Sequence, residues 1–130
     1  MNIITIKDET ALGTVLNEKK LDFATESVTI ADIIKARVAT EVAAYNKKLP
    51  SVFTGLIQPS AAEKVRNGFK VKKRKLIDAE KQIYIALDAF QKNGFFVLVD
   101  DWQADSLEQR VEIRSDTTVS FIKLTPLVGG

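Results

Sequence analysis

Alternating apolar and polar positions indicate β-structure near the start of the chain. Ile4 and Ile6 alternate with Thr5 and Lys7 within residues 2–7, and Leu21 and Phe23 alternate with their neighbours within residues 20–24. A period of two puts one face of a strand in a core and the other face towards solvent. We expect these two strands to pair as a hairpin across a loop over residues 8–17, in which Gly13 marks the turn.

A helical period begins directly after the second strand. Thr29 and Asp32 stand three residues apart and form a capping box, which is typical of a helix start. The apolar positions that follow recur at the helical spacing: Ile33, Ile34, Val38, Val42 and Tyr45. We expect this stripe to be core and the helix to lie across the sheet, with polar residues such as Arg37 and Glu41 mostly off the stripe.

The middle of the chain carries two further helix signals. Ser60 and Glu63 form a second capping box, for a short helix that Gly68 would end. Asp78 can cap a longer helix with a single apolar stripe. The stripe and the stop signal of this helix are Ala79, Ile83, Ala86, Leu87, Phe90 and the pair Asn93-Gly94. Residues 47–93 therefore predict a helical insertion between the first helix and the next strand.

Three more strands are predicted towards the end of the chain. Residues 95–99 are an almost unbroken apolar run, as expected of a central strand buried on both faces. A short strand follows near residues 110–114, and a long one starts at residue 118. Pro126 lacks an N–H and cannot continue a central ladder, so the last strand should stop near residue 125.

The pair Asp100-Asp101 comes directly after the apolar run. Two adjacent carboxylates point to opposite sides of an extended chain, and no third metal ligand is evident nearby. The pair therefore predicts a turn rather than a metal or general-acid site.

Composition limits the chemistry that this chain can perform. The 130 residues are 45% hydrophobic and 28% charged, which fits one domain with its own core. Cysteine and histidine are both absent, so the chain has no thiol nucleophile and lacks the commonest general base and metal ligand. We expect no enzyme activity. No apolar run suggests a membrane span or a signal peptide, so we expect no membrane contact and a cytoplasmic location.

Positive charge is concentrated in one segment. Residues 64–75 hold seven basic and no acidic side chains, so the rest of the chain is acidic although the formal net charge is +2. The candidate basic patch is Lys70, Lys72, Lys73, Arg74 and Lys75. Such a patch suits phosphate or an acidic protein surface. Because Phe69 is the single aromatic residue among these charges, the pattern favours a solvated connector over a nucleic-acid interface.

The last residues predict a presented carboxylate. Pro126 pushes the preceding residue into the extended region, so residues 127–130 should leave the body as a stretched tail. Gly129 and Gly130 have no Cβ and can enter a cleft too narrow for other residues. A free α-carboxylate is an anion at neutral pH and a poor acyl donor, but an adenylyl group from ATP would activate it. The alternative interpretation is a frayed end or a cloning scar.

The order of these elements resembles the ubiquitin-like β-grasp family. The resemblance is closest from Phe95-Phe-Val-Leu-Val-Asp-Asp to residue 130, and again at Ser27-Val-Thr-Ile-Ala-Asp-Ile-Ile-Lys-Ala-Arg-Val, which is similar to the first helix of ubiquitin. The tail Pro126-Leu-Val-Gly-Gly and the approach Asp116-Thr-Thr-Val-Ser-Phe are similar to those of the molybdopterin-synthase small subunit and ThiS-type sulfur carriers.

The resemblance covers roughly two-thirds of the chain. It implies an α+β fold in which a mixed sheet clasps a helix, as a single domain over residues 1–130 with a family-atypical insertion at about 47–93.

The resemblance also implies roles for individual residues. Gly130 would be the acyl donor, adenylated by a ubiquitin-activating, ThiF-like enzyme that consumes ATP, while the chain itself holds no cofactor or metal. Gly129 would provide clearance in the active-site cleft. The recognised tail would be Pro126, Leu127 and Val128. Ile122 and Leu124 share the other face of the last strand and are a candidate docking patch, unless the helix over residues 79–92 covers them.

Three functions stay open at this point. The first is a prokaryotic-type protein modifier, thioesterified and joined to target amines, with a conjugating enzyme, an isopeptidase and protein targets as partners. The second is a sulfur carrier that forms a Gly130 thiocarboxylate for cofactor biosynthesis. The third is an unconjugated β-grasp binding module that acts through Ile122, Leu124 or the basic patch.

Overall fold

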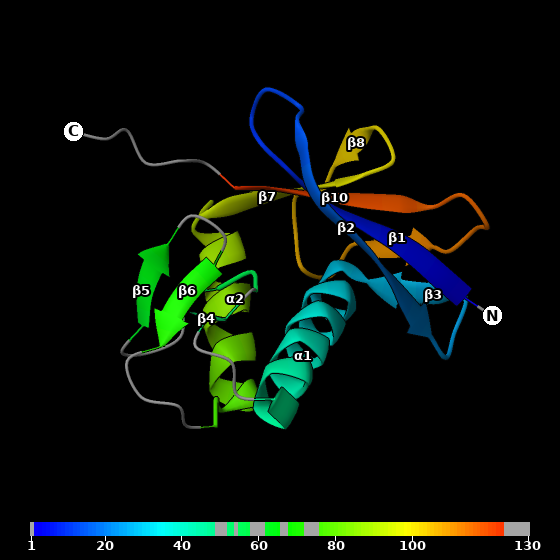
Figure 1. Cartoon of the computed structure of the whole chain (residues 1–130). Coiled ribbons are helices and arrows are strands. Elements are labelled where there is room, and N and C mark those ends of the chain that lie inside the picture. The colour runs from blue at the N-terminus through cyan, green and yellow to red at the C-terminus, as the bar shows by residue number, and fades with distance from the viewer. Residues whose placement is uncertain are drawn as a thin grey trace. The chain divides into compact units, whose positions relative to one another are not determined.

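A computed structural model describes residues 2–48, 52–53, 55–57, 62–65, 68–71 and 76–123 of this α+β chain. The chain divides into two compact units. The first unit is Met1–Ile33 with Ala89–Gly130, and the second unit is Ile34–Asp88. Both boundaries along the chain fall within helices, α1 (Ile30–Lys48) and α2 (Ala79–Gln91), which are labelled in Figure 1.

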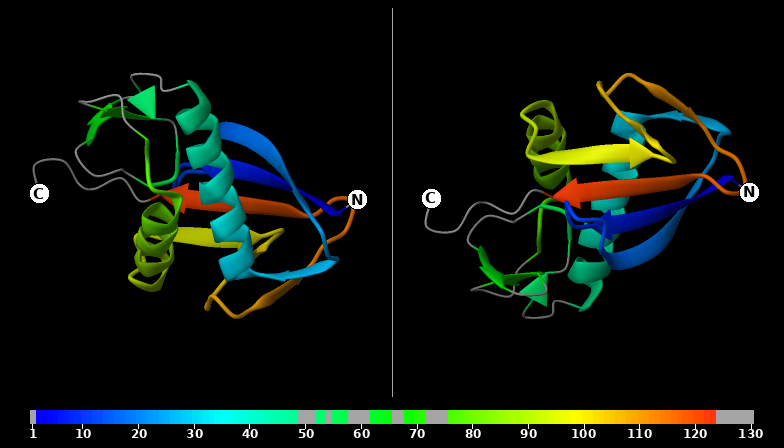
Figure 2. Two further views of the ribbon diagram at one scale, coloured as in Figure 1. Left: turned by 90° about the horizontal axis from the view of Figure 1, so that it is seen from below. Right: turned by 90° about the horizontal axis from the view of Figure 1, so that it is seen from above.

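A mixed five-stranded sheet forms the body of the first unit. Its strands are β1 (Asn2–Glu9), β2 (Val15–Phe23), β7 (Phe95–Val99), β8 (Trp102–Gln103) and β10 (Thr118–Lys123). They lie in the order β2-β1-β10-β7-β8. The central pair β1 and β10 is parallel, and the other three pairs are antiparallel. Figure 2 shows the last strand lying between the first strand and β7.

The predicted hairpin is confirmed, but its loop is shorter than expected. β1 runs on to Glu9 and β2 already begins at Val15, so the loop is confined to residues 10–14. Gly13 has a φ of 90° and takes the turn, as predicted. Polar residues such as Asn17 and Glu18 belong to β2 because an exposed edge strand does not need an apolar side chain at alternate positions.

One face of this sheet is buried. On β1 the buried residues are Ile4 and Ile6, as the alternation predicted. On β7 the residues Phe95, Val97 and Val99 are buried, whereas Phe96 and Leu98 between them are half-buried. The expectation of a strand buried on both faces was therefore wrong for the face of Phe96 and Leu98. The burial of the side chains in this run alternates because one face of the sheet is buried and the other face is half-buried.

A small second sheet holds the start of α1. It pairs β3 (Ser27–Thr29) with β9 (Arg110–Glu112) in antiparallel register. The predicted capping box is confirmed: Thr29 N–H donates to Asp32 Oδ2 at 2.9 Å, and Asp32 N–H donates to Thr29 Oγ1 at 3.1 Å. Two further N–H groups of the first helical turn donate to the carbonyls of Leu107 and Gln109.

The second unit contains a three-stranded antiparallel sheet where a short helix was expected. Its strands are β4 (Val52–Phe53), β5 (Ala62–Val65) and β6 (Gly68–Val71), in the order β4-β6-β5. Glu63 lies in β5, and Gly68 begins β6 rather than ending a helix. Val65 pairs with Gly68, so two residues connect the strands. Pairing with the later strand outweighs the local capping signal of two residues, since Glu63 is the partner of Lys70.

The longer helix of the insertion is confirmed with its predicted ends. Lys81 N–H donates to Asp78 Oδ1 at 3.2 Å at the start of α2. At the other end Asn93 adopts a φ of 60°, and Gly94 N–H donates to Ala89 O at 2.7 Å. Within its described residues, the insertion therefore contains three strands and one helix.

Two polar residues of α1 are buried, contrary to expectation. Arg37 and Glu41 are 1% and 7% exposed. They tolerate burial because Arg37 Nη2 donates to Glu41 Oε2 at 3.3 Å and the Leu56 N–H donates to Glu41 Oε1 at 3.0 Å. The predicted stripe itself, from Ile33 to Tyr45, is buried throughout.

Candidate functional site

The structure describes only part of the predicted site. Gly129, Gly130 and the tail over residues 126–128 lie outside the described residues, as does Leu124. In the candidate basic patch, Lys70 lies on β6, while Lys72, Lys73, Arg74 and Lys75 lie outside the described residues. Of the predicted docking patch, Ile122 is described and lies on β10. The candidate site is therefore built around β10 and its neighbours in the first unit.

β10 is anchored at its start by Asp100. The Asp100 N–H donates to Thr118 O at 2.7 Å, and Asp100 Oδ1 accepts the Thr118 N–H at 3.1 Å. Asp100 reaches this position through a left-handed φ of 53°, in the turn predicted at Asp100-Asp101. Aspartate tolerates this conformation better than most residues because its short polar side chain bonds locally. The turn thus couples the end of β7 to the start of β10.

Along its length β10 is held by both neighbours and by the core. It pairs with β1 on one side and with β7 on the other. Val119 and Phe121 are fully buried, and the Phe121 ring centroid lies 5.9 Å from that of Phe95. Burying a phenylalanine side chain contributes roughly 1.5–3 kcal/mol. β10 is therefore held in place by two neighbouring strands and by two buried side chains.

An apolar patch lies on the opposite face of the same strand. Ile122 is paired with Phe96 on β7, and the next pair on the same face of the two strands is Ser120 with Leu98. Directly paired residues share a face of a sheet, and Phe96, Leu98 and Ile122 are all half-buried. We call these three residues the open-face patch.

Charged side chains border the open-face patch on β1 and β2. Glu9 is the partner of Ile122 across the parallel pair, and Lys7 is the partner of Ser120. Lys7 is in turn paired with Glu18 on β2. The face therefore changes from apolar at β7 and β10 to charged at β1 and β2. This arrangement is typical of a protein-binding surface, in which an apolar centre is bordered by a polar rim.

Two members of the open-face patch were missed by the sequence analysis. Phe96 and Leu98 belong to the apolar run of β7, which was interpreted as buried on both faces. The composition of the run does not distinguish a strand buried on both faces from a strand buried on one face. The register with β10 does, because it places Phe96 beside Ile122.

Within residues 2–48, 76–123 and the short described stretches between them, no three His, Cys, Asp or Glu side chains gather as a metal site. Neither helix in the described part of the chain is long and apolar enough to span a membrane.

Comparisons with protein-family models, with curated proteins and with solved structures find no match to this chain.

Proposed function

We propose that this chain is a ubiquitin-like protein modifier of the prokaryotic type. The Gly130 carboxylate attacks the α-phosphate of ATP on an activating enzyme, which releases pyrophosphate and leaves an acyl-adenylate. An enzyme thiolate then displaces AMP to form a thioester. A lysine amine of the target finally displaces the thiolate and forms an isopeptide bond. The chain contributes the acyl group and its presentation, and the partner enzymes contribute the catalysis.

The order of the strands supports this proposal and the β-grasp fold that it includes. A hairpin of β1 and β2 is followed by α1, and the final strand β10 lies parallel to β1 in the middle of the sheet. A mixed sheet with a parallel central pair and the order β2-β1-β10-β7-β8 is the arrangement expected of a β-grasp.

The single observation that carries the proposal is the anchoring of β10 directly before the diglycine segment. β10 has a strand on each side and two fully buried side chains, and Lys123 at its end is followed by Leu-Thr-Pro-Leu-Val-Gly-Gly. A reactive end needs to reach into another protein's active site while its base stays fixed. A rigid strand followed by a proline and two glycines meets both needs.

The open-face patch supplies a docking surface for the activating enzyme in this proposal. Ile122 lies on β10, the strand that leads to the tail, and Phe96 and Leu98 lie on the neighbouring strand β7, so an enzyme bound to the patch contacts the strand that residues 124–130 follow in the sequence. Aromatic residues such as Phe96 are enriched at the centre of such surfaces.

Mass spectrometry of the protein recovered from its own cells tests the proposal. We expect Gly130 in amide linkage to lysines of other proteins, and we expect these adducts to disappear when Gly130 is deleted. Activation is measured separately as ATP-dependent thioester formation on the cell's adenylating enzyme. Ile122→Asp should weaken activation, whereas Thr5→Asp on β1, also half-buried, should weaken it much less.

The same recovery separates the alternatives. A terminus with one oxygen replaced by sulfur would instead support a sulfur carrier that forms a Gly130 thiocarboxylate. An unmodified Gly130 whose deletion has no effect would leave an unconjugated binding module that acts through the open-face patch. Either result would contradict the modifier.

A further inference from the structure

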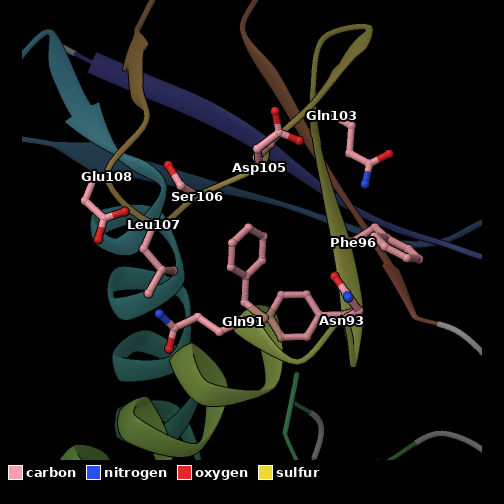
Figure 3. Close-up of a pocket in the computed structure, with 11 residues that line it drawn as sticks. Gln91, Asn93, Phe96, Gln103, Asp105, Ser106, Leu107 and Glu108 are labelled. Atoms are coloured by element: carbon pink, nitrogen blue, oxygen red, sulfur yellow. The ribbon is translucent and has the colours of Figure 1, made fainter.

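The five-stranded sheet of the first unit has two edges of very different length. β8 forms one edge and has only two residues. A cavity of about 330 Å³ is lined by the start of β7 and by the loop after β8. Figure 3 shows Asp105, Ser106, Leu107 and Glu108 of this loop on one side of that space. β2 forms the other edge with nine residues, and Figure 2 shows it along the outside of the sheet.

The outer side of β2 is a row of backbone groups without a neighbouring strand. β2 pairs with β1 on one side, and in the described part of the chain no strand pairs with its other side. From Asn17 to Phe23 the pairing with β1 is regular, and this stretch contains no proline. A long, regular edge of this kind is a template for the addition of another strand.

Apolar side chains are exposed at the hairpin end of this edge. Leu12, Val15 and Leu16 are 96%, 48% and 68% exposed. The turn that carries them is ordered, since the Thr10 N–H donates to Thr14 O at 2.9 Å. Single exposed apolar residues are normal on a surface, but three within five positions form a patch that a partner would cover.

The charges along β2 complement a second copy of the same strand running in the opposite direction. Its charged residues lie close together, as Glu18-Lys19-Lys20 and Asp22. In an antiparallel pair centred at Lys19, Glu18 of each copy lies opposite the two lysines of the other copy. Opposite charges across a ladder are favourable, whereas a parallel pair in register would place every charge opposite itself.

An antiparallel pair centred at Lys19 also uses the full length of β2. Counting outward from this centre, Val15 and Leu16 of one copy lie beside Phe23 of the other copy. Phe23 is half-buried, so the exposed apolar end of each strand gains an apolar neighbour. A centre displaced towards Phe23 would shorten the overlap and leave Val15 and Leu16 uncovered.

We propose that β2 pairs with β2 of a second copy of this chain in antiparallel orientation, so that the two five-stranded sheets join edge to edge. The two-fold axis passes at Lys19, and both copies use the same surface. Backbone hydrogen bonds hold the two strands, and the opposite charges set their direction. Because the interface is one strand wide, the dimer is weak and reversible. It does not involve Gly130, so it stands or falls separately from the proposed modifier activity.

Analytical ultracentrifugation of the full-length chain tests this pairing. We expect an equilibrium of monomer and dimer, which the Gly130-deleted chain should share. Glu18→Lys with Asp22→Lys makes the charged residues of β2 all basic, and Lys19→Glu with Lys20→Glu makes them all acidic. Each variant alone should associate at least about tenfold more weakly, because like charges then face each other. An equimolar mixture of the two variants should form dimers again.

A single introduced cysteine tests where the two strands cross. The chain has no cysteine of its own. Lys19→Cys places two thiols at the Cα separation of neighbouring strands, which a disulfide can bridge, so oxidised glutathione should link the two copies. Asn17→Cys lies on the same face of β2 but too far from its own copy, and it should stay unlinked.

A control with the same charge change completes the test. Glu112→Lys with Asp116→Lys replaces two exposed acids elsewhere in the same unit and should leave the dimer unchanged. Far-UV circular dichroism verifies that each variant is folded. A wild-type chain that stays monomeric at about 1 mM, or a mixture of the folded all-basic and all-acidic variants that stays monomeric, would overturn the proposal. Linkage at residue 17 but not at residue 19 would overturn it as well.

Discussion

Removing the buried Glu41 carboxylate is expected to destabilise the second unit strongly. Glu41 Oε2 lies 3.3 Å from Arg37 Nη2, and Glu41 Oε1 accepts the Leu56 N–H at 3.0 Å. The side chains of Arg37 and Glu41 are 1% and 4% exposed. Glu41→Leu fills most of the volume but takes this carboxylate away from a buried guanidinium and a buried N–H.

The size of the effect follows from this geometry. Breaking a buried ion pair by removing one partner costs about 3–5 kcal/mol, a large share of the roughly 5–15 kcal/mol that stabilises a typical domain. Replacing both partners with apolar residues, as in Arg37→Met with Glu41→Leu, removes the buried charge as well. The double variant should then lose less than the single variant, with about 1–3 kcal/mol of its loss coming from the Leu56 N–H that no longer has its carboxylate acceptor.

Urea unfolding followed by far-UV circular dichroism measures these losses. Hydrogen exchange at the Leu56 amide adds a local measurement, since this N–H should exchange faster in both variants. Thr40→Ala on the exposed side of α1 serves as the control and should change stability by less than about 0.5 kcal/mol. A single Glu41→Leu variant as stable as the control, or a double variant less stable than the single one, would refute the reasoning.

Three further outcomes follow from the first unit, each measured by urea unfolding with the fluorescence of Trp102 as the signal. Phe121→Ala should cost about 3–5 kcal/mol because it empties a fully buried position, and a cost below 1 kcal/mol would contradict the packing. Thr29→Ala should cost about 1 kcal/mol through loss of the cap, whereas Thr29→Ser should cost little. Gly13→Ala should cost about 1 kcal/mol because a φ of 90° strains the backbone of a residue with a Cβ. No atom lies within 4 Å of the added Cβ, so a clash would not explain the loss. A stabilised variant would contradict the backbone strain.

Local signals in the sequence predicted much of the fold correctly. The capping residues Thr29 and Asp78 mark the starts of α1 and α2, and Asn93-Gly94 marks the end of α2. The alternation at Ile4 and Ile6 identified the buried face of β1. These predictions are correct because each depends on residues a few positions apart. The hydrogen bonds of a helix cap and the alternation of side chains along a strand are both set within that distance.

The errors arose where distant residues compete with local signals. Ser60 and Glu63 resemble a helix start, yet Glu63 pairs with Lys70 across a hairpin. Glu41 is polar and was expected off the core, yet it is buried because its carboxylate meets Leu56 from a later part of the chain. Phe96 was taken as core, yet it shares the half-buried face of the sheet with Ile122. No window of a few residues contains these pairings.

The candidate site divides in the same way. The sequence by itself determined the diglycine tail, the proline before it and the strand that precedes them, since these depend on residue type and short spacing. Tertiary structure alone decided that β10 lies between β1 and β7, that Phe96 and Leu98 join Ile122 in one patch, and that a short β8 leaves a cavity beside Phe95. The physical reason is that strand register and edge cover are set by hydrogen bonds between segments far apart in the chain, which no local pattern records.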